Sequence, residues 1–115
     1  MNNENFDASL SVINCSKIYE QVREICNKIA DTYENKNKDY GNSFDELLDE
    51  IKAKGISPEV VFYIRAKDKL NRILSLSKMV ANVKDESKLD TVIDLATYSV
   101  MFARYLQEKR SAKYE

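Results

Sequence analysis

The chain has 115 residues, a typical size for one domain that buries roughly two thirds of its unfolded surface. Its 18 basic and 19 acidic residues give a net charge of −1, which excludes the overall positive field needed for non-specific binding of extended nucleic acid. The chain has no histidine, which excludes Ser-His-Asp and Cys-His catalysis. With only two glycines and one proline, the composition predicts an all-α fold.

No stretch of the sequence resembles a signal peptide, and no apolar run approaches the ~20 residues of a membrane span. We therefore expect a cytoplasmic protein that does not contact membranes. The two cysteines, Cys15 and Cys26, fall on one predicted helix, about 16 Å apart. This separation exceeds the roughly 7 Å between the Cα atoms of a disulfide, so we expect free, reduced and buried thiols.

In chain order, residues 1–13 are predicted to form an arm or a short helix. Residues 14–110 are predicted to form a single helical domain, and residues 111–115 a frayed tail. The first long helix should cover residues 14–35, because apolar residues recur there at three- and four-residue steps. These residues are Ile18, Val22, Ile25, Ile29 and Tyr33.

Residues 36–43 combine charge, an aromatic ring and a glycine between two helical patterns, and we interpret them as a loop. Gly41 can supply the positive φ that ends a helix, and Ser43 can cap the next one. This combination of residue types predicts a site loop rather than a simple turn. The candidate ligand-binding residues of this loop are Lys36, Lys38, Asp39, Tyr40 and Gly41.

The second helix should cover residues 44–53 and end at Gly55. Its apolar side is predicted to face inward, while Glu46 and Asp49 meet water. Asp45 and Glu50 lie at the edges of the apolar side, and Glu50 is the best-placed candidate metal ligand among these acids. A solvated acidic face remains the simpler interpretation.

Ser57-Pro58-Glu59 is a strong helix start, with a cap, a proline at the first helical position and an acid in the first turn. The third helix should cover residues 58–80, followed by a polar break over residues 82–86. On this helix Lys69 falls inside the apolar arc, with Arg65 and Arg72 at its border. Lys69 could extend its charge to the edge of the arc, form an ion pair within the fold, or join the two arginines in a cluster directed at a phosphate.

The fourth helix, over residues 87–110, is apolar almost all round. We expect it to be embedded, and a compact bundle of about four helices to be completed by homo-oligomerisation. On its one polar line, Asp90 and Asp94 lie one turn apart. They could bind a hard cation such as Mg²⁺, answer Lys69 from across the bundle, or simply face solvent.

Several short motifs resemble the first type of nucleotide modification associated domain, a family of small helical proteins common in phages and prophages. The resemblance covers roughly residues 30–105 and implies a link to nucleotide or modified-base metabolism. Tyr98 in the last motif joins the candidate ligand-binding residues. The motifs are Lys38-Asp39-Tyr40-Gly41, Ala66-Lys67, Arg72-Ile73, Asp85-Glu86 and Asp94-Leu95-Ala96-Thr97-Tyr98.

The chain is also similar to the all-α nucleoside triphosphate pyrophosphohydrolases of MazG type, in which Glu-x-x-Glu and Glu-x-x-Asp pairs hold Mg²⁺. It departs from that pattern in both pairs: the first is at best Glu46 with Asp49, and the second is Asp90 with Asp94. The candidate metal ligands are Glu50, Asp90 and Asp94.

Three functions follow as hypotheses. The chain could bind or sequester a nucleotide or cyclic nucleotide, the reading that its cationic and aromatic residues favour. It could be a Mg²⁺-dependent pyrophosphohydrolase. It could instead be a structural module that binds another protein.

Overall fold

The computed structural model describes the backbone of residues 8–40, 43–79 and 81–114, and the side chains of residues 14–37, 43–79 and 86–110. The described chain forms four helices and no strand, which confirms the all-α prediction. It divides into two compact units, Met1–Asn35 and Lys36–Glu115. The helices are α1 (Ala8–Tyr40), α2 (Ser43–Ala53), α3 (Pro58–Leu76) and α4 (Ala81–Tyr114).

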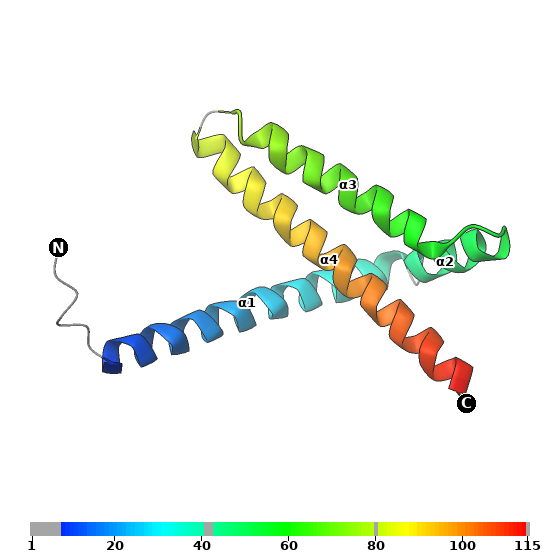
Figure 1. The fold of residues 1–115 in the computed structure, drawn as a ribbon, viewed down its shortest axis with the longest axis horizontal. Helices are drawn as coiled ribbons and strands as arrows, with labels where there is room; N and C mark the ends of the chain where they lie inside the picture. The colour runs from blue at the N-terminus through cyan, green and yellow to red at the C-terminus, as the bar shows by residue number, and fades with distance from the viewer. Residues whose placement is uncertain (1–7, 41–42, 80, 115) are drawn as a thin grey trace. The chain divides into compact units, whose positions relative to one another are not determined.

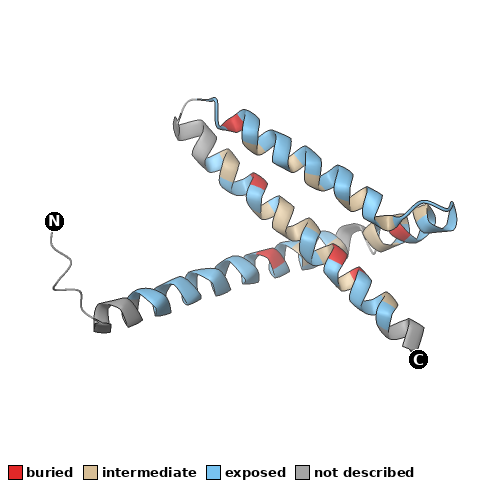
Figure 2. Cartoon of the chain, in the orientation of Figure 1, coloured by how far each residue is buried: buried red, intermediate tan, exposed pale blue. Residues whose placement is uncertain are grey.

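The first unit consists of α1 up to Asn35, and its described side chains are almost all exposed (Figure 2). Along the predicted apolar stripe, Ile18, Val22 and Ile25 are exposed, whereas Ile29 is buried. Both cysteines are free, as predicted, but they are exposed, so the prediction of buried thiols is wrong. The described residues of this unit belong to one helix, and no second element of the unit covers either thiol.

Helix α1 is longer than predicted at both ends. It begins at Ala8 and passes through the expected boundary at residue 13, and it continues to Tyr40. Residues 36–40 are therefore helical, and the prediction of a loop there is wrong. The physical reason is that this polar segment contains neither glycine nor proline before Gly41, and lysine is a good helix former. Gly41 itself lies outside the described residues.

In the second unit, α2 ends and α3 begins as predicted. Gly55 has φ of 81°, and the amides of Gly55 and Ile56 donate back to the carbonyls of Lys52 (3.0 Å) and Ile51 (3.1 Å). This is the hydrogen-bond pattern of a glycine-terminated helix. Two residues later the amide of Glu59 donates to the Ser57 hydroxyl at 3.3 Å, so Ser57 caps α3 ahead of Pro58.

Helices α3 and α4 lie side by side and run in opposite directions, as Figure 1 shows. Helix α3 ends at Leu76, four residues before the predicted end, and a turn follows in which the Ser77 hydroxyl donates to the Leu74 carbonyl. Helix α4 starts at Ala81 and runs to Tyr114, so the predicted break over residues 82–86 and the frayed residues 111–114 are both helical. Polar residues alone do not interrupt a helix.

The core of the second unit lies where α2, α3 and α4 meet. Leu48, Phe102 and Tyr105 are buried there, and Phe62 stacks on Phe102 with ring centroids 5.0 Å apart. Phe44 and Val61 pack around this cluster. Helix α4 contributes Phe102 and Tyr105 to this core, whereas other large apolar residues of the helix are exposed. The expectation that α4 is embedded is therefore not met within one chain. The exposed residues include Leu89, Val92, Val100 and Leu106.

Candidate functional site

Three basic residues form a line along the side of α3 that faces α4. Arg65, Lys69 and Arg72 are spaced four and three residues apart, which places them on one face of a helix. Lys69 is half-buried, while both arginines are exposed. The line follows from the sequence, and its partners on α4 follow from the antiparallel packing of the two helices.

Each of the three cations has a partner on α4. The Lys69 Nζ lies 3.4 Å from an Asp94 carboxylate oxygen. The Arg72 Nε donates to the Thr91 hydroxyl at 3.3 Å, and the guanidinium carbon of Arg65 lies 6.0 Å from the centre of the Tyr98 ring. We name these six residues the α3–α4 polar row.

The α3–α4 polar row brings together five residues that the sequence suggested separately, from the basic line of α3 and from the motifs of α4. These are Arg65, Lys69, Arg72, Asp94 and Tyr98. From the sequence, Lys69 was expected either to form an ion pair within the fold or to bind a ligand. The structure shows the ion pair, made with one of the two acids that were proposed for it.

The charges of the row are only partly compensated. The Asp94 side chain is 53% exposed, so its pair with Lys69 is of the solvated kind that contributes roughly 0–1 kcal/mol. Arg72 binds a neutral hydroxyl, which in turn donates to the Ser87 carbonyl at 2.7 Å, and Arg65 lies over a neutral ring. Among the described side chains, no carboxylate forms an ion pair with either arginine.

Tyr98 is held between two neighbours. Besides Arg65, it meets Phe44 of α2, with ring centroids 6.1 Å apart and the rings tilted by 50°. The contact with Phe44 positions the Tyr98 ring, and the ring in turn orients the Arg65 guanidinium, since cations are attracted to the face of an aromatic ring.

The remaining ligand candidates of the N-terminal segment are not brought into this row by any described contact. Lys36 is exposed in the last turns of α1. The side chains of Lys38, Asp39 and Tyr40, and all of Gly41, lie outside the described residues. The predicted convergence of Asp39 and Tyr40 with Lys69, Arg72 and Asp94 therefore stays a prediction.

The structure does not gather the three predicted metal ligands. Glu50 is bound to Lys54, one turn along α2, at 3.3 Å. Asp90 and Asp94 share α4 as predicted, but Asp94 is paired with Lys69. Within the described part of the chain, no three acidic or cysteine side chains lie close enough to hold a metal ion. On α2, Asp45 and Asp49 form ion pairs with Arg104 and Lys109 of α4.

A second polar cluster joins α2 to α4, and the sequence analysis did not foresee it. Asp45 forms an ion pair with Arg104, which also binds Glu108 at 3.0 Å. Asp49, which was expected to meet only water, accepts a hydrogen bond of 2.9 Å from the Tyr105 hydroxyl and lies 3.3 Å from Lys109. The spacing of Asp45 and Asp49, four residues apart on α2, indicated that the two carboxylates share one helix face. Their partners on α4 could not be predicted, because these contacts depend on how α2 packs against α4.

Burial and hydrogen bonding in this second cluster shift two pKa values in opposite directions. Burial, with help from the bond to the Asp49 carboxylate, raises the pKa of Tyr105 to about 12. The hydrogen bond that Tyr105 donates, together with Lys109, lowers the pKa of Asp49 below its ordinary value. The protonated tyrosine and the ionised aspartate therefore stabilise each other at neutral pH.

An open hollow of about 510 Å³ lies beside this cluster, between the turn that joins α2 to α3 and the C-terminal half of α4. Its wall includes Ile56 and Leu106, with Lys52 and Lys109 also lining it. None of the ligand residues proposed from the sequence lines it, so the hollow and the α3–α4 polar row are separate features.

None of the described helices is both long enough and apolar enough to cross a membrane. The chain matches no protein-family model, and no curated protein or solved structure matches it either.

Proposed function

We propose that the chain is a cytoplasmic protein that binds a phosphorylated nucleotide, such as a mononucleotide or cyclic nucleotide, at the α3–α4 polar row. The observation that carries the proposal is the alignment of Arg65, Lys69 and Arg72 on one face of α3, opposite Asp94 and Tyr98 of α4. The motifs that resemble the nucleotide modification associated domain contribute three members of the row from two parts of the chain, Arg72 on α3 and both Asp94 and Tyr98 on α4.

The chemistry of the row suits a phosphate. Arg65 and Arg72 keep their charge while contacting neutral groups, and guanidinium groups bind phosphate oxygens in pairs of parallel hydrogen bonds. Lys69 becomes free to bind a phosphate once its partly exposed ion pair with Asp94 breaks, which costs about 1 kcal/mol or less. A phosphate would then take the place of the Asp94 carboxylate on Lys69.

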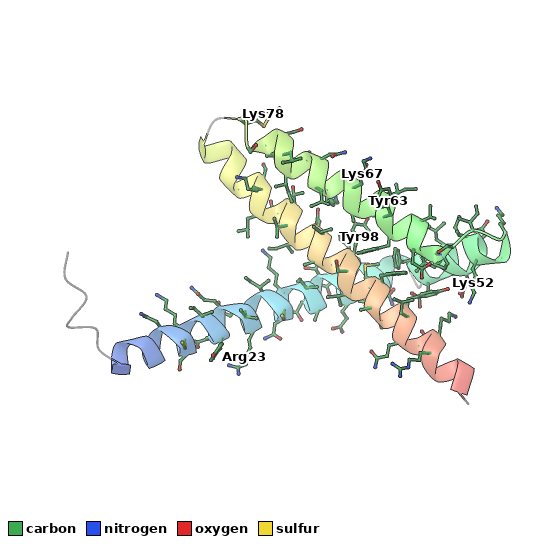
Figure 3. All side chains as sticks on the ribbon, viewed as in Figure 1. Arg23, Lys52, Tyr63, Lys67, Lys78 and Tyr98 are labelled. Atoms are coloured by element: carbon green, nitrogen blue, oxygen red, sulfur yellow. The ribbon has the colours of Figure 1, made fainter. Side chains whose placement is uncertain are left out.

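A thermal-shift screen of nucleotides, with and without Mg²⁺, tests this proposal. A ligand present at 100 times its Kd should stabilise the chain by about 2.7 kcal/mol, and therefore raise its Tm. In the variant Lys69→Ala we expect that shift to disappear. Lys67→Ala is the matched control, because Lys67 lies beside Tyr63, 5.8 Å from its ring centre, and is exposed on the other side of α3 (Figure 3). A shift that survives Lys69→Ala would contradict the site.

The geometry gives less support to hydrolysis of a phosphoanhydride. That reaction needs carboxylates that share a metal ion, and the acids of the described chain are dispersed or paired with cations. Mg²⁺-dependent release of pyrophosphate that is lost in Asp94→Asn would establish it nonetheless.

One observation favours a protein-binding module as the second candidate. Large apolar side chains are exposed on α1, α3 and α4, including Ile18, Leu74 and Val100. Exposed apolar surface of this extent is typical of interaction sites. If no mononucleotide or cyclic nucleotide changes the Tm, this second function is the better account.

A further inference from the structure

Thr91 is a polar residue buried at the contact of α3 and α4, with only 3% of its surface exposed. A hydroxyl that is buried among apolar groups destabilises a fold unless it forms hydrogen bonds, and threonine is a weaker helix former than most residues. Valine has the same shape without the polar atom. The packing of the two helices alone therefore does not require a threonine at this position.

The hydrogen bonds of Thr91 make its hydroxyl an acceptor for Arg72. A threonine hydroxyl has one hydrogen to donate and two lone pairs that accept. Thr91 donates this hydrogen to the Ser87 carbonyl, one turn earlier in α4, at 2.7 Å. The lone pairs remain for a donor, and the Arg72 Nε donates to the hydroxyl from α3 at 3.3 Å. The backbone of α4 thus orients the hydroxyl, and the hydroxyl orients the arginine.

This contact leaves most of the Arg72 guanidinium available. A guanidinium is planar and has five N–H donors, one on Nε and the other four on the two terminal nitrogens. Thr91 takes the one on Nε. Among the described residues, no group forms a hydrogen bond or an ion pair with the terminal nitrogens. Two parallel N–H groups at this edge match two oxygens of one phosphate.

The contact also lies in register with the ion pair at the centre of the α3–α4 polar row. Arg72 follows Lys69 by three residues on α3, and Thr91 precedes Asp94 by three residues on α4. Three residues correspond to about 4.5 Å along a helix axis. A phosphate that replaces Asp94 on Lys69 is therefore within one helical turn of Arg72.

We propose that Thr91 is a positioning residue, which holds the Arg72 guanidinium so that its terminal nitrogens receive the phosphate of the ligand. The role in binding rests on the proposed function, whereas the contact between Thr91 and Arg72 does not. An exposed arginine that rotates freely loses conformational entropy when it binds an anion, which weakens binding by roughly 3- to 10-fold. An arginine that Thr91 already holds loses less.

The NMR signals of the arginine Nε–H groups test the positioning without any ligand. In the wild-type chain, the heteronuclear Overhauser effect should show that the Arg72 side chain is restricted. In Thr91→Val, Arg72 should become as mobile as Arg23, which is exposed on α1. Thr91→Ser keeps the hydroxyl and should restore the restriction. An Arg72 side chain that is equally mobile in the wild type and in Thr91→Val would overturn the inference.

Titration with inorganic phosphate, followed on the same signals, tests the effect on binding. Thr91→Val should bind phosphate roughly 3- to 10-fold more weakly than the wild type, and Thr91→Ser nearly as well as the wild type. In the Arg72→Ala background, where the Arg65 signal reports binding, Thr91→Val should have no further effect. The reason is that Thr91 acts only through Arg72.

Thr97→Val is the matched control for the loss of a hydroxyl on α4. Thr97 is half-buried and donates to the Ile93 carbonyl at 2.8 Å, as Thr91 donates to Ser87, but no described cation donates to its hydroxyl. This variant should keep both the restricted Arg72 and the affinity for phosphate. Circular dichroism should show unchanged helix content in Thr91→Val, because Arg72 is exposed and its Nε can bond to water instead.

The wild-type titration separates this inference from the proposed function. If neither phosphate nor any nucleotide binds the wild-type chain, the proposed function is wrong, and the role of Thr91 in binding is wrong with it. If phosphate binds but Thr91→Val changes neither the affinity nor the mobility of Arg72, the proposed function stands and only the role of Thr91 is refuted.

Discussion

Replacing Leu48 by alanine is expected to lower the free energy of unfolding by about 2–5 kcal/mol. Leu48 is completely buried and lies in the cluster with Phe102 and Tyr105, where α2 meets α4. The substitution removes apolar contacts and leaves a cavity that the surrounding rings can fill only in part. Urea denaturation followed by circular dichroism at 222 nm measures the loss.

Leu74→Ala is the matched control for this prediction. Leu74 is 65% exposed on α3, so the same change in chemistry should alter the free energy of unfolding by only about 0.5 kcal/mol. Equal losses in the two variants would mean that the core does not lie between α2 and α4.

The second large effect is expected at alkaline pH, at Tyr105. Its pKa in the folded chain is about 12, against 10.0 for an unperturbed tyrosine. Below pH 10 the hydroxyl is protonated in both states and its contribution is complete. Between pH 10 and 12 the unfolded chain loses this proton while the folded chain keeps it, so stability falls as the pH rises. A shift of this size corresponds to roughly 2–3 kcal/mol.

Tyr105→Phe isolates this effect from the other tyrosines and the lysines. The variant lacks the hydrogen bond to Asp49 and should be about 1 kcal/mol less stable at pH 8. As the pH rises to 12, the wild-type chain should lose this advantage, because only the wild-type chain carries the titrating hydroxyl. Parallel curves of stability against pH for the two proteins would refute this account of Tyr105.

The local signals of the sequence were sufficient to locate the junction of α2 and α3. Gly55 takes the positive φ that only glycine adopts without strain, and Ser57 and Pro58 start the next helix as their chemistry requires. These features depend on neighbouring residues only, which is why sequence alone predicts them.

Two polar segments were wrongly predicted to be non-helical, residues 36–40 and 82–86. Both contain lysine and an acid or asparagine, and neither contains glycine or proline. The polarity of a segment indicates that it is solvated, but it does not decide whether the segment is helical. Lysine and glutamate are good helix formers because their side chains lose little conformational freedom in a helix.

The basic line of α3 was also predictable, since residue spacing fixes which side chains share a helix face. The partners on α4 required the register between helices, so the sequence could name Asp94 for Lys69 but could not foresee Thr91 beside Arg72. Asp49 accepts hydrogen bonds from Tyr105 and Lys109, which are still further away along the chain, and the sequence did not predict these contacts.

This difference in span has a consequence for the order of folding. The contacts of Lys69 and Arg72 with α4 join residues 25 and 19 positions apart, whereas Asp49 and Tyr105 are 56 positions apart. Closing the shorter loop costs less chain entropy, so the hairpin of α3 and α4 should assemble first and α2 should dock onto it afterwards. Pulse-labelled hydrogen exchange during refolding would then show the amides of α3 and α4 protected before those of α2, and the reverse order would exclude this pathway.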